Sequence, residues 1–313
     1  MNQDQKFISA VAAVDADRKE LTGFLDLIVG ALSERFSQGE LILVVREDHE
    51  GGDQEIREYF TAHPTGMLIS IVTMDRTSGK ESAMNAGRDL AIGDYVFEFD
   101  DIHVDYDAAV IGEAYEKCLE GYDIVTVRSD KKARFTSGLF YRTFNRLSGV
   151  GRKLGPSTLR VLSRRAINRV KSLGTYIPYR KAVYEHAGLT STEIKYHSTD
   201  PERKNRHTIR EERGDLAFDS FIYFTKLMER LSLGICALFF AIAVGVVIYI
   251  VCSLIADEQL MSGWVSIMGF LSIGFTGLFG LLTIVIKYLS VLVDLTFRRQ
   301  RYLIRDIEKI SGV

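Results

Sequence analysis

Acidic side chains follow three of the short apolar runs in the first third of the sequence. Asp15 and Asp17 follow the first run, Asp48 follows the second, and Asp100 and Asp101 end the fourth. If these runs are parallel strands, their carboxyl ends meet at one crevice, so the carboxylates would lie close together. Carboxylate oxygens are the ligands that Mg²⁺ and Mn²⁺ prefer, and such an ion can bridge phosphate oxygens. The alternative for the first three acids is that they are solvated loop residues capping the next helices.

Glu98 is an unusual residue for its position inside the apolar segment YVFEF. Because side chains alternate along a strand, Glu98 should share a face with Asp100. A carboxylate buried there needs a partner or a raised pKa. A structural salt bridge and a role at the site both stay open.

The elements that must position these residues follow a regular rhythm. Short apolar runs alternate with amphipathic helical stretches, and the runs cover residues 7–14, 40–47, 67–74, 94–101 and 122–129. This strand and helix alternation predicts an α/β fold with a doubly wound, mostly parallel sheet. We place this soluble domain at residues 1–215.

Two long uncharged stretches follow the soluble domain. Residues 233–256 and 264–286 contain 24 and 23 residues without a charge. At about 1.5 Å rise per residue, each spans the roughly 30 Å hydrocarbon core of a bilayer. We therefore predict a two-helix transmembrane hairpin at residues 233–293. The alternative is a pair of helices buried in a large soluble core.

The charges around the hairpin predict its orientation. Basic residues flank its two outer ends, and the connector between the helices has none, so both termini should be cytosolic at the inner membrane. No basic and apolar signal opens the sequence, which agrees with a cytosolic domain. Glycines in the second helix permit a homo-oligomer. Nucleic acid is not a predicted partner, since the formal net charge is −2.

The segments on either side of the hairpin are amphipathic. Residues 216–232 predict an interfacial helix on the inner leaflet, and the alternative is a helix packed on the soluble domain. Residues 294–313 predict a basic cytosolic tail that binds the same anionic surface.

Residues 75–87 read DRTSGKESAMNAG and are followed by Gly93-Asp94 and a strand ending in FDD. This order and spacing resemble the inverting glycosyltransferases of family two. More narrowly, they resemble the dolichyl- or polyprenyl-phosphate sugar transferases with a C-terminal transmembrane hairpin. The resemblance continues through residues 122–125, 139–149, 159–165 and 206–210, so it covers nearly the whole chain.

The resemblance implies a GT-A-like fold, a nucleotide-sugar donor, a polyprenyl phosphate acceptor at the membrane, and Mg²⁺ or Mn²⁺ as the cofactor. It implies three groups of site residues. The catalytic residues would be Asp100, Asp101 and Arg160, and the two aspartates would also hold the metal. The donor would be bound by Asp15, Asp48, Arg76, Gly79, Lys80, Asn85 and Asp100. The acceptor phosphate would be bound by Arg142, Arg160, Arg206 and Arg210.

Three positions depart from the family pattern. Ile102 stands at the second position of the D-x-D motif, Asp48 ends a segment that usually reads V-D-D-G-S, and Thr158 replaces an acceptor-site aspartate. A lipid phosphate is already anionic, so a missing base need not abolish transfer.

Two functions follow from these residues. The first is an enzyme, a hexosyltransferase that moves a sugar to an undecaprenyl-type phosphate for a cell-envelope glycan. The second is a catalytically degenerate relative that acts as a binding or assembly partner. A processive polysaccharide synthase is disfavoured, because Trp264 is the only tryptophan and the cytosolic Q-x-x-R-W motif is absent.

Overall fold

The computed structural model describes residues 3–14, 18–46, 52–75, 79–130, 157–172, 180–198, 227–255, 264–297 and 302–311. The chain divides into two compact units. One contains Met1–Ala217 together with Arg298–Val313, and the other contains Phe218–Phe297.

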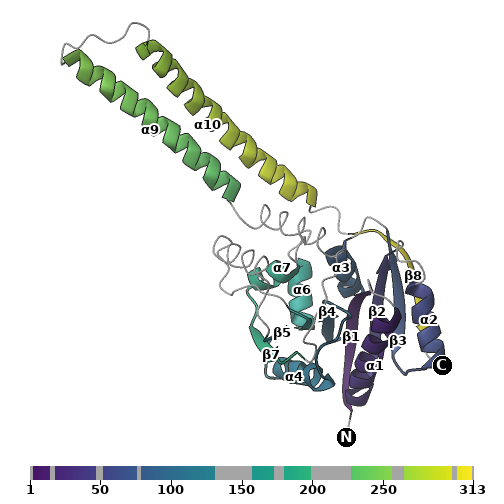
Figure 1. Cartoon of the computed structure of the whole chain (residues 1–313). Helices are drawn as coiled ribbons and strands as arrows, with labels where there is room; N and C mark the ends of the chain where they lie inside the picture. The colour runs from purple at the N-terminus through teal and green to yellow at the C-terminus, as the bar shows by residue number, and fades with distance from the viewer. Residues whose placement is uncertain are drawn as a thin grey trace. The chain divides into compact units, whose positions relative to one another are not determined.

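The first unit is built on an eight-stranded sheet within the described part of the chain (Figure 1). Its strands are β1 (Asp4–Val14), β2 (Phe36–Arg46), β3 (Leu68–Met74), β4 (Tyr95–Phe99), β5 (Ile124–Ser129), β6 (Leu159–Ser163), β7 (Ser191–Tyr196) and β8 (Ile304–Ser311). Their order is β7-β5-β6-β4-β1-β2-β3-β8. Strands β6 and β8 run antiparallel to their neighbours, and the other strands run in one direction. The predicted mostly parallel sheet is therefore confirmed.

The order of the central strands creates a switch point. Strands β2 and β3 extend the sheet on one side of β1, whereas β4 pairs with the other side of β1. Ligands of open α/β sheets bind beyond the carboxyl ends of the strands at such a point. Asp100 is the residue that directly follows β4, so it stands at this edge.

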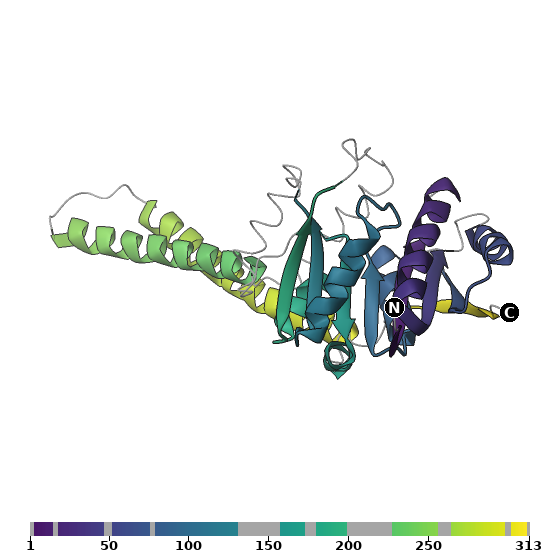
Figure 2. The same ribbon diagram turned by 90° about the horizontal axis from the view of Figure 1, so that it is seen from below.

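Helices cover both faces of the sheet (Figure 2). One face packs against α1 (Arg18–Arg35), α2 (Gly52–Ala62) and α4 (Ala108–Leu119), and the side chains between them form the main core. The other face carries α3 (Lys80–Leu90), α6 (Arg164–Ser172) and α7 (Arg180–His186), which are joined by hydrogen bonds such as Lys171 Nζ to the Asp89 carbonyl. The polar face of β4 therefore lies beneath α3 and α7.

Two glycines of the segment that carries the family resemblance have structural roles. A Cβ on Gly87 would collide with Val11 and lie 3.0 Å from Val44, so α3 can approach β1 and β2 only because this residue lacks a side chain. A Cβ on Gly93 would lie 2.7 Å from the Ile8 carbonyl carbon. The next residue, Asp94, donates its backbone N–H to the Phe7 carbonyl at 2.7 Å. These residues let α3 pack closely on the sheet and hold the start of β4 beside β1.

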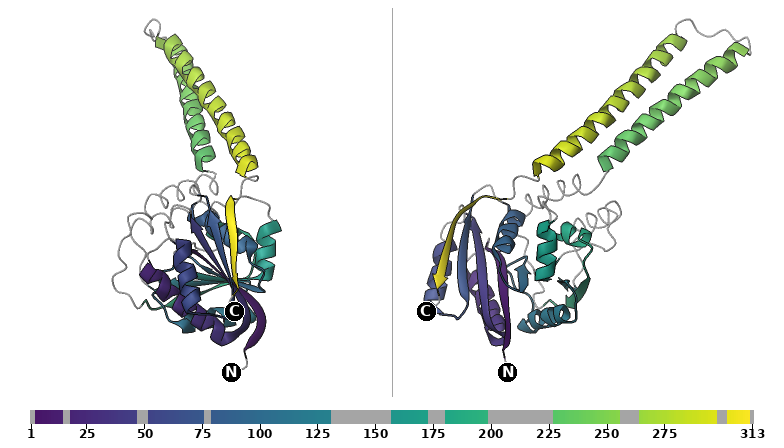
Figure 3. Two further views of the ribbon diagram at one scale, coloured as in Figure 1. Left: turned by 90° about the vertical axis from the view of Figure 1, so that its right-hand side faces the viewer. Right: turned by 180° about the vertical axis from the view of Figure 1, so that it is seen from behind.

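The C-terminal tail differs from its prediction as a basic segment on the membrane surface. Residues 304–311 form β8, an edge strand that pairs antiparallel with β3 (Figures 1 and 3). Ile310 packs against the main core, and Glu308 pairs with Arg57 at 2.6 Å. Strand pairing satisfies backbone groups along β3 that an exposed edge would leave to water. The tail thus belongs to the first unit.

The second unit contains two long helices, α9 (Leu227–Ile255) and α10 (Trp264–Phe297). They pack antiparallel. The ring of Phe239 stacks on Phe275 and Phe279 at 5.2 and 4.9 Å, and Tyr249 contacts Trp264 at 5.5 Å. Both predicted segments are therefore helical; α9 begins earlier than predicted, and α10 ends later.

Both helices are apolar within the described part of the chain. Ile267–Ser290 of α10 is long and apolar enough to cross a membrane, by length and composition alone. The apolar stretch in the described part of α9 is shorter, Leu233–Tyr249. Most of the predicted interfacial helix at 216–232 lies outside the described residues, and residues 227–232 are part of α9.

Candidate functional site

Strands β4 and β6 place a carboxylate pair beside an arginine at the switch point. Glu98 is directly opposite Arg160 in the antiparallel register. The backbone N–H of Asp100 donates to the Thr158 carbonyl at 2.8 Å, which extends the pairing beyond the end of β4. Glu98 and Asp100 consequently share one face, as the strand period predicts.

Arg180, the first residue of α7, is the central cation of this site. Its side chain is 1% exposed. Nη1 donates to Glu98 at 2.8 Å, Nη2 donates to Asp100 at 2.9 Å, and Nε donates to Glu81 of α3 at 3.0 Å. A buried charge is tolerated only when it is paired and hydrogen-bonded, so these carboxylates and Arg180 require each other.

Asp100 has both of its oxygens engaged. Oδ1 accepts from Arg180, while Oδ2 accepts from Ser157 Oγ at 2.7 Å and pairs with Lys181 Nζ at 3.1 Å. Arg160 Nη2 in turn donates to Ser157 Oγ at 3.0 Å. Burial alone would raise the pKa of Asp100, but the charges of Lys181, Arg180 and Arg160 hold it well below its usual range. Asp100 is therefore an ionised carboxylate that is paired with Arg180 and Lys181.

Glu98 is part of the supporting structure under Asp100. It is fully buried and accepts from Arg180 and from Tyr184 Oη at 2.6 Å. The Tyr184 hydroxyl also accepts from Arg88 Nη1 at 3.2 Å, and the Arg160 guanidinium stands 5.1 Å from the ring centroid of Tyr184. The structure favours the structural salt bridge for Glu98, since its partners come from the protein itself.

The predicted metal ligands do not form a metal site. Asp100 already carries Arg180 and Lys181, Asp101 accepts from the backbone N–H of His103 at 3.2 Å, and Ile102 is buried in the core. Among the residues that the structure describes, no group of three or more His, Cys, Asp or Glu could hold a metal ion. The donor set at Asp100 and Asp101 thus does not fit the predicted Mg²⁺ or Mn²⁺.

The other predicted site residues fall into two sets. On α3, Gly79 is the N-cap, Lys80 begins the helix, and Asn85 is buried. The second set lies outside the described residues and consists of Asp15, Asp48, Arg76, Arg142, Arg206 and Arg210. Of the predicted site residues, Arg160 is joined to Asp100 through Ser157. The roles of the six residues in the second set stay predictions.

Two further polar residues, Thr158 and Asp105, have partners within the protein. The Thr158 hydroxyl points toward the Val127 carbonyl, 3.5 Å away. Asp105 is buried and accepts from Tyr196 Oη and Ser198 Oγ, both at 2.5 Å. Asp105 therefore ties the segment after β4 to the end of β7.

Sequence reasoning missed two of the three cations at the centre of the site, Arg180 and Lys181. Arg180 and Lys181 lie about eighty residues beyond Asp100 in the chain, in a segment with no motif. The available signal was Glu98, whose burial in an apolar strand demanded a positive partner. That signal predicts a cation but does not say which one.

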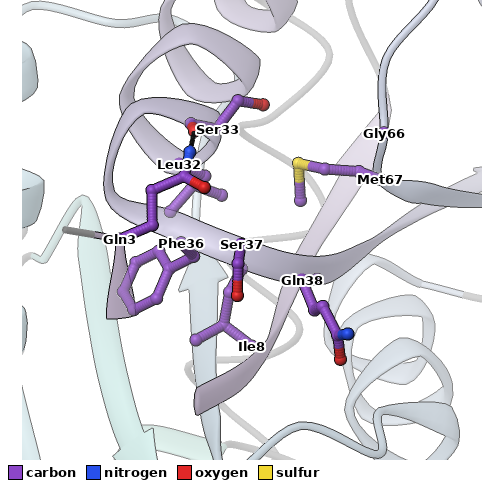
Figure 4. A pocket seen from close by; sticks show the side chains of 10 residues that line it. Gln3, Ile8, Leu32, Ser33, Phe36, Ser37, Gln38, Gly66 and Met67 are labelled. Atoms are coloured by element: carbon purple, nitrogen blue, oxygen red, sulfur yellow. Dashed lines mark hydrogen bonds between the residues drawn. The ribbon is translucent and has the colours of Figure 1, made fainter. Parts of the chain in front are cut away.

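A cavity of about 200 Å³ lies at the opposite end of the sheet (Figure 4). It is lined by uncharged residues around the starts of β1 and β2, including Ile8, Phe36 and Gln38, and Gln3 donates to the Ser33 carbonyl at 2.7 Å beside it. Since it has no charged lining and lies away from Asp100, it is not part of the site.

The mixed sheet with a carboxylate at its switch point is a GT-A-like fold. Among solved structures it is similar to glucosyl-3-phosphoglycerate synthase from Mycobacterium tuberculosis in complex with Mn²⁺ and UDP-glucose. That match has 14% identity and a TM-score of 0.51 over 69% of this chain and 77% of that one. At this identity the likeness shows the fold alone.

The curated relatives that the chain resembles in sequence are glycosyltransferases. One from Synechocystis sp., itself uncharacterised, is 29% identical over 46% of this chain and 47% of its own length. An undecaprenyl-phosphate 4-deoxy-4-formamido-L-arabinose transferase from Aeromonas hydrophila is 26% identical over 56% of each chain. The chain thus spans about half the length of these relatives. No protein-family model matches the chain.

Proposed function

We propose that this chain is an inverting glycosyltransferase that moves a sugar from a nucleotide-diphosphate donor to polyprenyl phosphate at the cytoplasmic face of a membrane. The observation that carries the proposal is a set of three cations at the carboxyl end of β4. Arg160, Arg180 and Lys181 stand around Asp100 there. A departing diphosphate develops concentrated negative charge, and fixed cations at that place stabilise it. The GT-A-like fold and the glycosyltransferase relatives support the same reaction class.

The acceptor is inferred from Thr158, which stands where the resembling family has an aspartate near the acceptor. The Thr158 hydroxyl faces a backbone carbonyl, and a hydroxyl at its ordinary pKa is a poor base. A polyprenyl phosphate is an anionic nucleophile at neutral pH, so it needs no deprotonation. The Aeromonas hydrophila relative, named for its undecaprenyl-phosphate substrate, supports this acceptor. Arg160, Arg142, Arg206 and Arg210 are the proposed phosphate ligands.

Chain connectivity supports a hairpin that crosses the membrane twice. Strand β8 follows α10 in the sequence yet pairs with β3, which precedes α9. One sheet cannot have strands on both sides of a bilayer, because strand pairs in lipid must close into barrels. The chain must therefore cross an even number of times between Met74 and Ile304. If α10 spans the membrane, so does α9.

The test measures sugar transfer by the full chain in detergent. Purified protein is incubated with a panel of nucleotide-diphosphate sugars and undecaprenyl phosphate, and the anomeric configuration of the product is determined by NMR. We expect one donor to give a product of inverted configuration. Asp100→Asn should reduce transfer at least 100-fold, whereas Asp107→Asn, an exposed residue at the start of α4, should leave it unchanged. Transfer by Asp100→Asn at the wild-type rate would contradict the site.

A second function is favoured by the fixed contacts of Thr158 and Ile102. If the chain is a catalytically degenerate relative, it would bind or assemble with a partner without turnover. The same panel separates the two functions, because a degenerate relative gives no product with any donor.

A further inference from the structure

The Asp100 carboxylate carries a cation at the place where a metal-dependent enzyme of this fold would hold its ion. Lys181 Nζ lies 3.1 Å from Asp100 Oδ2, and Arg180 Nη2 lies 2.9 Å from Oδ1. A divalent ion bound to the same carboxylate would stand in contact with both positive charges. At such separations like charges repel strongly when water is largely excluded. The contacts of Asp100 therefore oppose a metal there.

The formal charges around Asp100 already balance. Arg160, Arg180 and Lys181 contribute three positive charges, and three carboxylates accept them, namely Glu81, Glu98 and Asp100. Because this cluster is neutral, a diphosphate that arrives at this edge must share a cation with one of these carboxylates.

The three cations are not equally available to such a ligand. Arg180 is 1% exposed and divides its donors among three carboxylates. Arg160 is held under the Tyr184 ring and on Ser157. Lys181 is 12% exposed, and Asp100 is its ion-pair partner among the described residues. An ammonium group has three donors, so Lys181 can bind Asp100 and phosphate oxygens at the same time.

We propose that the Lys181 ammonium, held on Asp100, takes the place of the divalent cation and binds the diphosphate of the donor directly, so that donor binding needs no metal ion. Arg180 is a positioning residue in this arrangement, because it fixes Asp100 and thereby Lys181. The inference rests on the proposed function, since it presumes a nucleotide-diphosphate donor.

The test measures binding of UDP and GDP to the full chain in detergent by isothermal titration calorimetry, in EDTA and in MnCl₂. We expect the tighter of the two nucleotides to bind with affinities that agree within about threefold in the two buffers. Lys181→Met should weaken binding in EDTA by 10-fold or more, because one direct charge-assisted contact is lost. Lys181→Arg should retain binding within about threefold. Lys117→Met, an exposed lysine on α4, is the matched control.

The outcomes separate the inference from the function on which it rests. Binding that is lost in EDTA and restored by MnCl₂ overturns metal independence and leaves the transferase proposal standing. Unchanged binding by Lys181→Met overturns the role of Lys181. If neither UDP nor GDP binds in any buffer, the inference fails, and the transfer assay with the full donor panel decides the proposed function. Should Lys181→Met not fold, the EDTA comparison and Lys181→Arg still decide.

Discussion

The Arg180 guanidinium joins three carboxylates that come from separate parts of the chain. Glu81 lies on α3, Glu98 is in β4, and Asp100 follows β4. Breaking a buried pair by removing one partner is strongly destabilising, because the remaining charge keeps its desolvation cost. The same contact that orients Asp100 for a ligand therefore also holds α7 to the sheet.

Replacing Arg180 tests how strongly the fold depends on this cluster. Arg180→Met keeps much of the side-chain length but leaves Glu98 fully buried with Tyr184 and the more distant Arg160. We expect the free energy of unfolding to fall by about 3–5 kcal/mol. Urea unfolding of the full chain at constant detergent, followed by circular dichroism, measures the change.

Arg57→Met is the matched control for that measurement. Arg57 pairs with Asp53 and Glu308 on the surface, with its side chain 47% exposed. Exposed ion pairs contribute about 0–1 kcal/mol, so this variant should unfold close to the wild type. Equal losses in the two variants would show that Arg180 is not a buried structural cation.

At the scale of elements, the docking of α3 determines whether Lys80 and Glu81 reach the site. This helix lies on β1 and β2 at Gly87, where no side chain fits without displacing Val11. The sequence segment that carries the family resemblance is therefore partly a packing motif. Its glycines position the helix, and the helix positions Glu81 against Arg180.

Two glycine substitutions separate packing from helix propensity. Gly87→Ala should destabilise the soluble unit by about 1–3 kcal/mol, since overpacking forces neighbouring atoms to shift. Gly30→Ala on α1 has no atom within 4 Å of the added Cβ, so helix propensity should stabilise it by up to about 1 kcal/mol. Thermal unfolding of both variants in the same detergent gives the comparison. A stabilising Gly87→Ala would contradict the close contact of α3 with the sheet.

The strands β1–β5 could be predicted from the sequence, because their apolar runs are long and lie between amphipathic helical stretches. Strand β8 could not. Its isoleucines, Ile304, Ile307 and Ile310, are spaced by three residues, which matches the period of a helix. In the strand, Ile310 pairs with Ile69 and Ile307 with Val72, so these two side chains lie on opposite faces, and a register shift separates them from Ile304. Ile307 is 42% exposed. An edge strand needs only one half-buried face, so its sequence pattern is weak.

The site shows the same limit of local patterns. The position of Asp100 at the end of an apolar strand is a local feature, and the sequence predicts it. Which cation pairs with Asp100 depends on how α7 lies on β4, and that contact joins residues 80 positions apart. Composition and spacing do not predict such a long-range contact. The pairing of Lys181 with Asp100 is therefore known only from the structure.

At the scale of the whole molecule, the pairing of β8 with β3 constrains how the chain meets a membrane. The helices α9 and α10 expose apolar side chains over much of their length, and Phe270 and Ile273 are 80% and 72% exposed within the described part of the chain. Water-exposed apolar surface of this extent marks a binding or membrane surface. If α10 crosses a membrane, the pairing of β8 with β3 requires that α9 cross it as well.

Thiol labelling of single-cysteine variants tests this topology. In a background with Cys118, Cys236 and Cys252 replaced by serine, we introduce Lys195→Cys on β7, Lys309→Cys on β8 or Gln259→Cys between the two long helices. A membrane-impermeant maleimide should label Lys195→Cys and Lys309→Cys in inverted vesicles. It should label Gln259→Cys in right-side-out vesicles, because two spans place the connector on the opposite side.

Each departure from this labelling pattern has a separate meaning. If Gln259→Cys is labelled together with Lys195→Cys, the helix pair does not cross the membrane, and its apolar surface must be covered by protein instead. If Lys309→Cys is labelled on the side opposite to Lys195→Cys, an odd number of spans separates β8 from the sheet. That result would exclude the β3 to β8 pairing in the membrane-bound protein, since strands of one sheet cannot face opposite compartments.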